Sequence, residues 1–172
     1  MKQAPRERAS ARGLRIAVLR SLFNGGITDG LVTGARAALD EMGADARRVR
    51  VFDVPGAFEL PLAARAAALS GRFDAVIALG AVIEGETDHY EHVAREAASG
   101  LAAVGRETGV PVSFGVLTVR EAVQAERRSL PGPENKGAEA ARAAVLLVET
   151  LRAIGGPASA RRRAPRPARR RA

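Results

Sequence analysis

Two histidines and several carboxylates follow an apolar stretch near the middle of the chain. The stretch, residues 75–81, is rich in β-branched side chains, which predicts a strand buried on both faces of a parallel sheet. Gly85 would let the backbone turn, and Thr87 or Asp88 would cap the helix that follows. His89 is then in the first turn of this helix, at the edge of the sheet where ligands of open α/β folds bind. It is a candidate acid or base near neutral pH.

His89 also has a simpler interpretation, as a solvated residue on a helix surface. His92 shares its helix face, and together with Glu96 it suggests a metal site. No HExxH pattern and no cysteine supplies further ligands, so we predict no metal.

The composition suits one globular domain. The chain has 172 residues, of which 47% are hydrophobic, and it contains no cysteine. A disulfide framework and thiol catalysis are therefore excluded. No apolar run approaches the length of a membrane span, and the N-terminus lacks the apolar core of a secretory signal. We expect a soluble cytoplasmic protein without membrane contact.

The net charge of +8 is concentrated at the two ends of the chain. Residues 1–12 contain four basic residues and one acidic residue, and residues 155–172 contain seven arginines. Residues 13–154 contain sixteen basic and eighteen acidic residues. We therefore predict a flexible basic arm at 1–12, with an organelle transit peptide as the weaker alternative, a folded domain at 13–154 and a disordered Arg-rich tail at 155–172.

The charge raises a nucleic-acid-binding function as one hypothesis. It is disfavoured for the folded domain, which is mildly acidic, and aromatic residues make up only 3% of the chain. Polyanion binding by the tail remains open beside the alternative of a merely solvated extension.

Strands and helices are predicted to alternate along the domain. The expected strands are 14–19, 48–54, 75–81 and 111–117, and the expected helices are 27–42, 60–70, 88–108, 119–128 and 136–154. Thr118 is expected to cap the helix 119–128. This alternation predicts an α/β protein with a parallel sheet, right-handed crossovers and every strand exit on one edge. The phosphate-loop and dinucleotide glycine patterns are both absent.

Four local motifs occur in an order that resembles the 6,7-dimethyl-8-ribityllumazine synthase family. They are Phe23-Asn24; the run 54–61 (VPGAFELP); Gly80-x-Val82-Ile83-x-Gly85-x-Thr87-x-His89; and Gln124-Ala125 with Arg128 and Asn135-Lys136-Gly137. The resemblance covers residues 13–154. It implies a flavodoxin-like three-layer sandwich with a central parallel sheet, assembled as a homopentamer or as an icosahedral shell of 60 subunits, with active sites between adjacent subunits.

The resemblance also implies an activity. Members of the family are transferases that condense 5-amino-6-(D-ribitylamino)uracil with 3,4-dihydroxy-2-butanone 4-phosphate, releasing phosphate and water, in the penultimate step of riboflavin biosynthesis. They need no metal or organic cofactor, and association with riboflavin synthase is a further implied partnership. The alternative is a paralogue that binds riboflavin or a lumazine without making it.

Site residues follow from matching the motifs. For the ribitylaminouracil, the resemblance implies Phe23, Ala57, Phe58, Glu59, Ala81, Val82, Ile83 and, from the neighbouring subunit, Phe114. Phe23 offers a face for stacking on a pyrimidine, and Glu59 can accept hydrogen bonds from ribityl hydroxyls. Taken alone, Phe23 would fit a core position, and Glu59 would fit a helix N-terminus.

For the butanone phosphate, the resemblance implies Glu86, Thr87 and Arg128, with His89 moving protons and Lys136 as a weaker electrostatic candidate. Arg128 can hold a phosphate with two parallel hydrogen bonds, although a cation also suits a helix C-terminus. Glu84 stands where many relatives have a basic residue. Both it and Glu86 add negative charge near the expected phosphate and put the strength of its binding in doubt.

Overall fold

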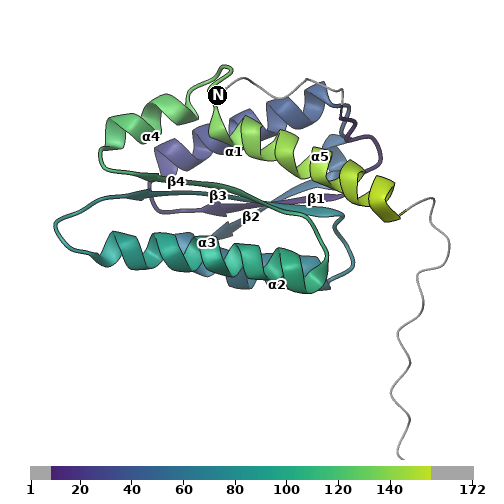
Figure 1. Ribbon diagram of the computed structural model, residues 1–172. Helices are drawn as coiled ribbons and strands as arrows, with labels where there is room; N and C mark the ends of the chain where they lie inside the picture. Colours follow the sequence, from purple (N-terminus) through teal and green to yellow (C-terminus); the bar gives the residue numbers. More distant parts are fainter. Residues whose placement is uncertain (1–8, 156–172) are drawn as a thin grey trace, which may run out of the picture.

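Four parallel strands form the centre of the molecule in the order β2-β1-β3-β4 (Figure 1). The computed structural model describes residues 9–155. Within it the strands are β1 (Ile16–Ser21), β2 (Val49–Val54), β3 (Ala75–Ile83) and β4 (Val112–Val119). The chain order reverses between β1 and β3, and in flavodoxin-like sheets this switch point is where ligands bind.

Helices cover both faces of this sheet, as Figure 1 shows. One face carries α1 (Gly25–Glu41), α4 (Ala122–Ser129) and α5 (Lys136–Gly155), and the other carries α2 (Leu60–Leu69) and α3 (His89–Thr108). Two short 3₁₀ turns, η1 (Ala46–Arg48) and η2 (Ala57–Glu59), lead into β2 and α2. The predicted α/β three-layer sandwich with a parallel sheet is confirmed.

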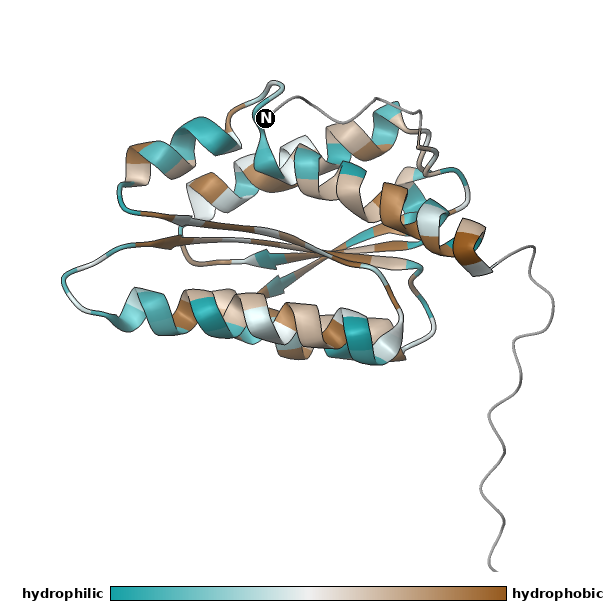
Figure 2. Ribbon diagram, in the orientation of Figure 1, coloured by the Kyte–Doolittle hydropathy of each residue, from teal (hydrophilic) through white to brown (hydrophobic). Residues whose placement is uncertain are grey.

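The central strand β3 is the most deeply buried element. Its first eight residues are all buried, because helices cover both of its faces and a strand pairs with each of its edges. In Figure 2 the strands are correspondingly among the hydrophobic parts of the ribbon. The apolar run at 75–81 thus predicted a buried strand correctly, although the pairing with β4 continues as far as Ile83 opposite Val119.

The connection between α4 and α5 is held by one buried side chain. The Asn135 amide donates to the carbonyl oxygens of Gly30, Ser129 and Leu130 at 2.8–3.1 Å, and its Oδ1 accepts from the backbone N–H of Ala138 at 3.0 Å. A buried polar group satisfied in this way fixes the residues around it. Arg128, near the end of α4, and Lys136, at the start of α5, therefore lie on either side of a well-defined loop.

Two local expectations differ from the structure. Thr118 does not begin a helix, because it and Val119 continue the pairing of β4 with β3. Helix α4 begins instead after Glu121, whose side chain and that of Gln124 form a reciprocal capping box.

The ends of the domain also differ in detail from the expected bounds. Ala11 is fully buried and donates to the Met42 carbonyl at 2.9 Å, so packing begins before residue 13. Residues 1–8 of the predicted arm and residues 156–172, nearly all of the predicted Arg-rich tail, lie outside the described residues.

Candidate active site at the switch point

Hydrogen bonds at the strand exits join the ends of all four strands. Leu22 and Phe23 donate through their backbone N–H groups to the carbonyls of Val54 and Pro55, which ties the exit of β1 to that of β2. The Asn24 side chain donates to the Ala81 carbonyl at 2.9 Å, and the Glu84 N–H donates to the Val119 carbonyl at 2.9 Å. The four strand exits therefore form one continuous edge, as parallel strands predict.

An open cleft of ≈ 580 Å³ lies at this edge, beside the switch point between β1 and β3. It brings together nine predicted site residues from four separate segments: Phe23, Ala57, Phe58, Glu59, Ala81, Val82, Ile83, Thr87 and His89. A volume of this size suits a small organic molecule.

The walls of the cleft combine aromatic, apolar and ionisable groups. Phe23 is 74% exposed and Phe58 56% exposed, so both rings are available to a ligand and neither serves as a core residue. Glu59 lies close to Gly56, where an added Cβ would come within 3.0 Å of the carboxylate. Aromatic faces beside a carboxylate can hold a flat heterocycle that carries hydroxyl groups.

His89 lies at the start of α3 and is exposed on the cleft wall. Asp88 occupies the N-cap position, but neither it nor Thr87 makes the side-chain capping bond that the sequence suggested. The first N–H groups of α3 therefore lack this side-chain acceptor, and such groups favour an anion. His92, one turn further on, is not part of the cleft lining.

Gly85 is not required by the turn that it makes. Its backbone is outside the left-handed region, and an added Cβ would have nothing within 4 Å. The glycine instead leaves the backbone of the cleft wall uncovered, where a ligand can approach it closely.

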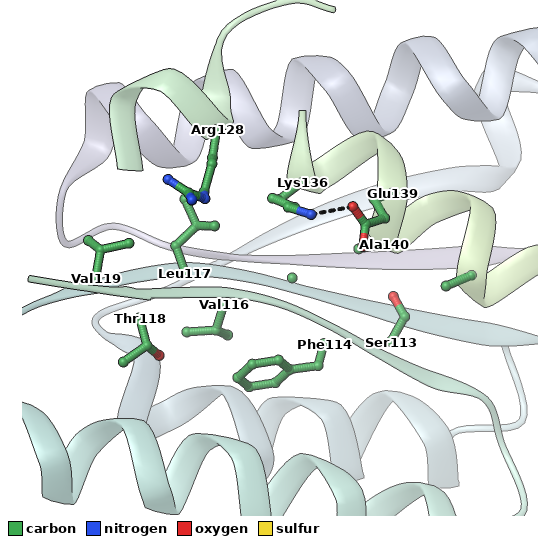
Figure 3. A pocket seen from close by; sticks show the side chains of 12 residues that line it. Ser113, Phe114, Val116, Leu117, Thr118, Val119, Arg128, Lys136, Glu139 and Ala140 are labelled. Atoms are coloured by element: carbon green, nitrogen blue, oxygen red, sulfur yellow. Dashed lines mark hydrogen bonds and ion pairs between the residues drawn. The ribbon is translucent and has the colours of Figure 1, made fainter. Parts of the chain in front are cut away.

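A second cavity of ≈ 290 Å³ contains three of the four remaining predicted residues, Phe114, Arg128 and Lys136 (Figure 3). It lies along β4, one of the two edge strands of the sheet. Arg128 of α4 and Lys136 of α5 lie on one side of this strand. Phe114, which belongs to β4 and is 46% exposed, lies on the other side. Lys136 pairs with Glu139, and Arg128 donates to the Gln124 carbonyl at 2.7 Å.

The predicted residues are therefore divided between two cavities that share no lining residue. Glu86 lines neither of them, although its neighbours Gly85 and Thr87 line the cleft. Glu84 also lies outside both cavities and pairs with Arg120 at 3.8 Å. The two carboxylates that cast doubt on phosphate binding thus lie apart from the lining of the cleft.

Sequence reasoning missed Tyr90 and Val93, which line the cleft from α3. Their spacing of three residues places them on one helix face, and this periodicity was the available indication. Among residues 9–155, no group of three or more His, Cys, Asp or Glu side chains is arranged to hold a metal ion. No helix in that same range is both long and apolar enough to cross a membrane.

Comparison with known proteins gives the same assignment across nearly the whole domain. Residues 13–152 match the model of the family described as 6,7-dimethyl-8-ribityllumazine synthase. The chain belongs to this family. It is 46% identical over 147 residues to the 6,7-dimethyl-8-ribityllumazine synthase of Syntrophus aciditrophicus (strain SB), which covers 86% of the chain and 96% of the relative. It is 50% identical over 141 residues to the enzyme of the same name from Edwardsiella ictaluri (strain 93-146), covering 81% of the chain and 90% of the relative.

Membership of the lumazine synthase family confirms the resemblance that the four motifs indicated. Both cavities and every residue of the motifs lie within the matched segment. The Arg-rich tail lies beyond this segment.

Proposed function

We propose that the chain is a 6,7-dimethyl-8-ribityllumazine synthase. It condenses 5-amino-6-(D-ribitylamino)uracil with 3,4-dihydroxy-2-butanone 4-phosphate, with release of phosphate and water. The observation that carries the proposal is the cleft that holds Phe23, Glu59 and His89 together in a member of this family.

The cleft suits the ribitylaminouracil. The exposed ring of Phe23 stacks on the pyrimidine, while Ala81, Val82 and Ile83 border its edge and Glu59 accepts hydrogen bonds from the ribityl hydroxyls. Ala57 and Phe58 complete this side, where the backbone of the 3₁₀ turn is available for hydrogen bonds to the uracil.

The butanone phosphate binds next to Thr87, where backbone N–H groups at the start of α3 favour an anion. Glu86 contributes through its backbone, since its side chain lies outside the lining. Attack of the amine on the ketone forms an imine once the ketone oxygen has gained protons and left as water. Loss of phosphate then requires a proton to be removed from the adjacent carbon. His89 is the titratable group in the cleft wall that is suited to both transfers.

We further propose that the complete site is formed between subunits. Phe114, Arg128 and Lys136 lie in a cavity of their own on the exposed edge strand, so a neighbouring chain is needed to bring such residues to the cleft. Arg128 then holds the phosphate with its guanidinium, and Lys136 adds positive charge.

The assembly expected for this arrangement is a homopentamer. The short connection between α4 and α5, held by Asn135, resembles that of shell-forming members of the family, which supports a shell of twelve pentamers as the further extension. Light scattering distinguishes these states, and a monomer at micromolar concentration would refute both.

A fluorescence assay for the lumazine product tests the activity. We expect turnover with both substrates in the presence of a chelator, since only proton transfer and phosphate positioning are required. His89→Ala should slow turnover by about 10- to 10⁴-fold. His92→Ala, a histidine on the same helix outside the cleft, is the matched control and should retain activity. Binding of the product without turnover by the unmodified chain would favour the binding paralogue.

The remaining proposals concern partners and location. The seven arginines of the tail bind polyanions through charge alone, and multiple copies in an assembly strengthen weak contacts. Deleting residues 160–172 should keep lumazine formation and lower the salt concentration at which the protein leaves a nucleic-acid column. We also propose that the chain associates with riboflavin synthase, which co-elution of the two proteins would test. The proposed location is the cytoplasm.

A further inference from the structure

Asn24 has a backbone conformation that no other described non-glycine residue shares. Its φ and ψ are 58° and 46°, in the left-handed region, and it is the single such case among residues 9–155. This conformation is unfavourable for most L-residues, and asparagine tolerates it better than others. The position is the one that links β1 to α1, directly beside the exposed ring of Phe23.

The Asn24 side chain is also used in an unusual way. Asn24 is the N-cap residue of α1, where an asparagine normally accepts a hydrogen bond from the first turn of its own helix. No such bond is made. The amide donates instead to the Ala81 carbonyl, 57 positions away in the sequence, at 2.9 Å.

This bond spans the gap where β1 and β3 separate. The two strands pair only as far as Arg20 opposite Leu79, and the exit of β1 then follows β2 through the N–H groups of Leu22 and Phe23. Strand β3 continues past this point, so the Ala81 carbonyl has no partner in β1. The Asn24 amide takes the place of that missing partner.

The cleft lies at this gap, since Phe23 and Asn24 after β1 and Ala81 of β3 all line it. Phe23 is 74% exposed and so has little packing to hold its ring in place. Its position depends on the backbone of the loop, which the Asn24 amide anchors to β3.

We propose that Asn24 is a positioning residue for the ribitylaminouracil. By joining the β1 exit to Ala81, it holds the Phe23 ring at a fixed height above the Ala81–Ile83 edge, so that a pyrimidine fits between them. Asn24 acts through these two neighbours. The inference rests on the proposed function, because it assigns Asn24 a part in that same site.

Two substitutions separate the roles of the backbone and the side chain. Asn24→Gly adopts the left-handed conformation without strain and removes only the amide. Asn24→Asp keeps the shape but places a carboxylate oxygen against the Ala81 carbonyl. We expect the KM for ribitylaminouracil to rise about 2- to 12-fold in Asn24→Gly, the effect of one lost hydrogen bond, and further in Asn24→Asp. The KM for the butanone phosphate should change less than about 2-fold.

A stability control is available in the same turn of α1. Thr28 is buried, and its hydroxyl donates to the Gly25 carbonyl at 3.3 Å. Thr28→Val removes that bond without altering the cleft lining, so it should lower the Tm and leave both KM values unchanged. A purely structural role for Asn24 would likewise lower the Tm of the Asn24 variants and leave both KM values unchanged.

A double-mutant cycle with Phe23→Ala tests the proposed route. If Asn24 acts by holding the Phe23 ring, then Asn24→Gly should change the KM for ribitylaminouracil less than about 2-fold once the ring is absent. Fully additive effects, or equal rises in both KM values, would overturn the proposal.

The wild-type enzyme and a fluorescence titration with the lumazine product separate this inference from the proposed function. Turnover by the wild type with unchanged KM values in both Asn24 variants would overturn the role of Asn24 alone. Product binding without turnover would refute the synthase activity. Weaker product binding in Asn24→Gly than in the wild type would then support the role of Asn24, and equal binding would overturn it. If the wild-type chain showed neither turnover nor product binding, both the synthase activity and the role of Asn24 would be overturned.

Discussion

Replacing Phe23 by alanine separates ligand binding from folding more clearly than any other change in the cleft. Its side chain is 74% exposed, so only about a quarter of the ring is removed from solvent by folding. Full burial of a phenylalanine contributes about 1.5–3 kcal/mol, and the buried part of Phe23 therefore contributes about 0.4–0.8 kcal/mol. In a chain of this size, such a loss lowers the Tm by about 1–3 °C.

The expected effect on binding is much larger. Stacking of a base on an aromatic ring contributes about 1–3 kcal/mol when measured by alanine substitution. Phe23→Ala should therefore raise the KM for ribitylaminouracil about 5- to 150-fold. The KM for the butanone phosphate should remain nearly constant, since that substrate has no aromatic ring to stack.

The assay is steady-state lumazine formation with each substrate varied in turn, combined with a thermal melt. Phe73→Leu is the matched control, because Phe73 is 8% exposed and packs edge-to-face against Phe52 away from the cleft. It should lower the Tm by more than Phe23→Ala does and leave both KM values unchanged. A Phe23→Ala enzyme with a large loss of Tm and an unchanged KM for the pyrimidine would refute the reasoning.

Three further expectations concern other parts of the molecule. Arg128→Ala should raise the KM for the butanone phosphate while affinity for the ribitylaminouracil stays nearly constant. Arg127 lies outside both cavities, so Arg127→Ala should change neither value. Equal losses of affinity for both substrates in Arg128→Ala would indicate damaged packing. Side-chain hydrogen bonds from Arg15 lower the pKa of Asp74, so this carboxylate stabilises the fold above about pH 4 and loses that effect as the pH falls. The free energy of unfolding of Asp74→Asn, measured by urea titration, should therefore depend less on pH between about 5 and 3 than that of the wild type. Gly137→Ala would place a Cβ 1.9 Å from a backbone carbonyl of α1 and should cost about 1–3 kcal/mol in urea unfolding, while Gly26→Ala, with nothing within 4 Å, should be tolerated.

The layers of the fold could be predicted from the sequence because they depend on local patterns. The apolar run at 75–81 and the helical period at 27–42 each reflect burial that repeats along one element. Once strands and helices alternate, the parallel sheet and the common edge for the strand exits follow from connection rules. The grouping of Phe23, Glu59 and His89 at one edge therefore followed from topology together with family resemblance.

What could not be predicted depends on contacts between distant segments. Thr118 was predicted to cap a helix, but its pairing with β3 keeps it extended. Helix α4 begins after Glu121, and because glutamate is an uncommon N-cap residue, the sequence gave little indication of this start. The bonds of Asn135 to the Gly30 carbonyl and of Asn24 to the Ala81 carbonyl span 105 and 57 positions. No local pattern indicates such partners, because the acceptors are backbone carbonyls that every residue carries.

The division of the candidate site into two cavities has a genetic consequence. A substitution in the cleft, such as His89→Ala, and one at the edge strand, such as Arg128→Ala, would damage different halves of the site. If the proposed ring forms, each half of the site meets the opposite half of a neighbour. Two defective chains produced together in equal amounts would then form intact sites at about a quarter of their interfaces. Two alleles that are each inactive alone would then complement each other when co-expressed, and selection would act on the interface between chains as much as on the individual chain.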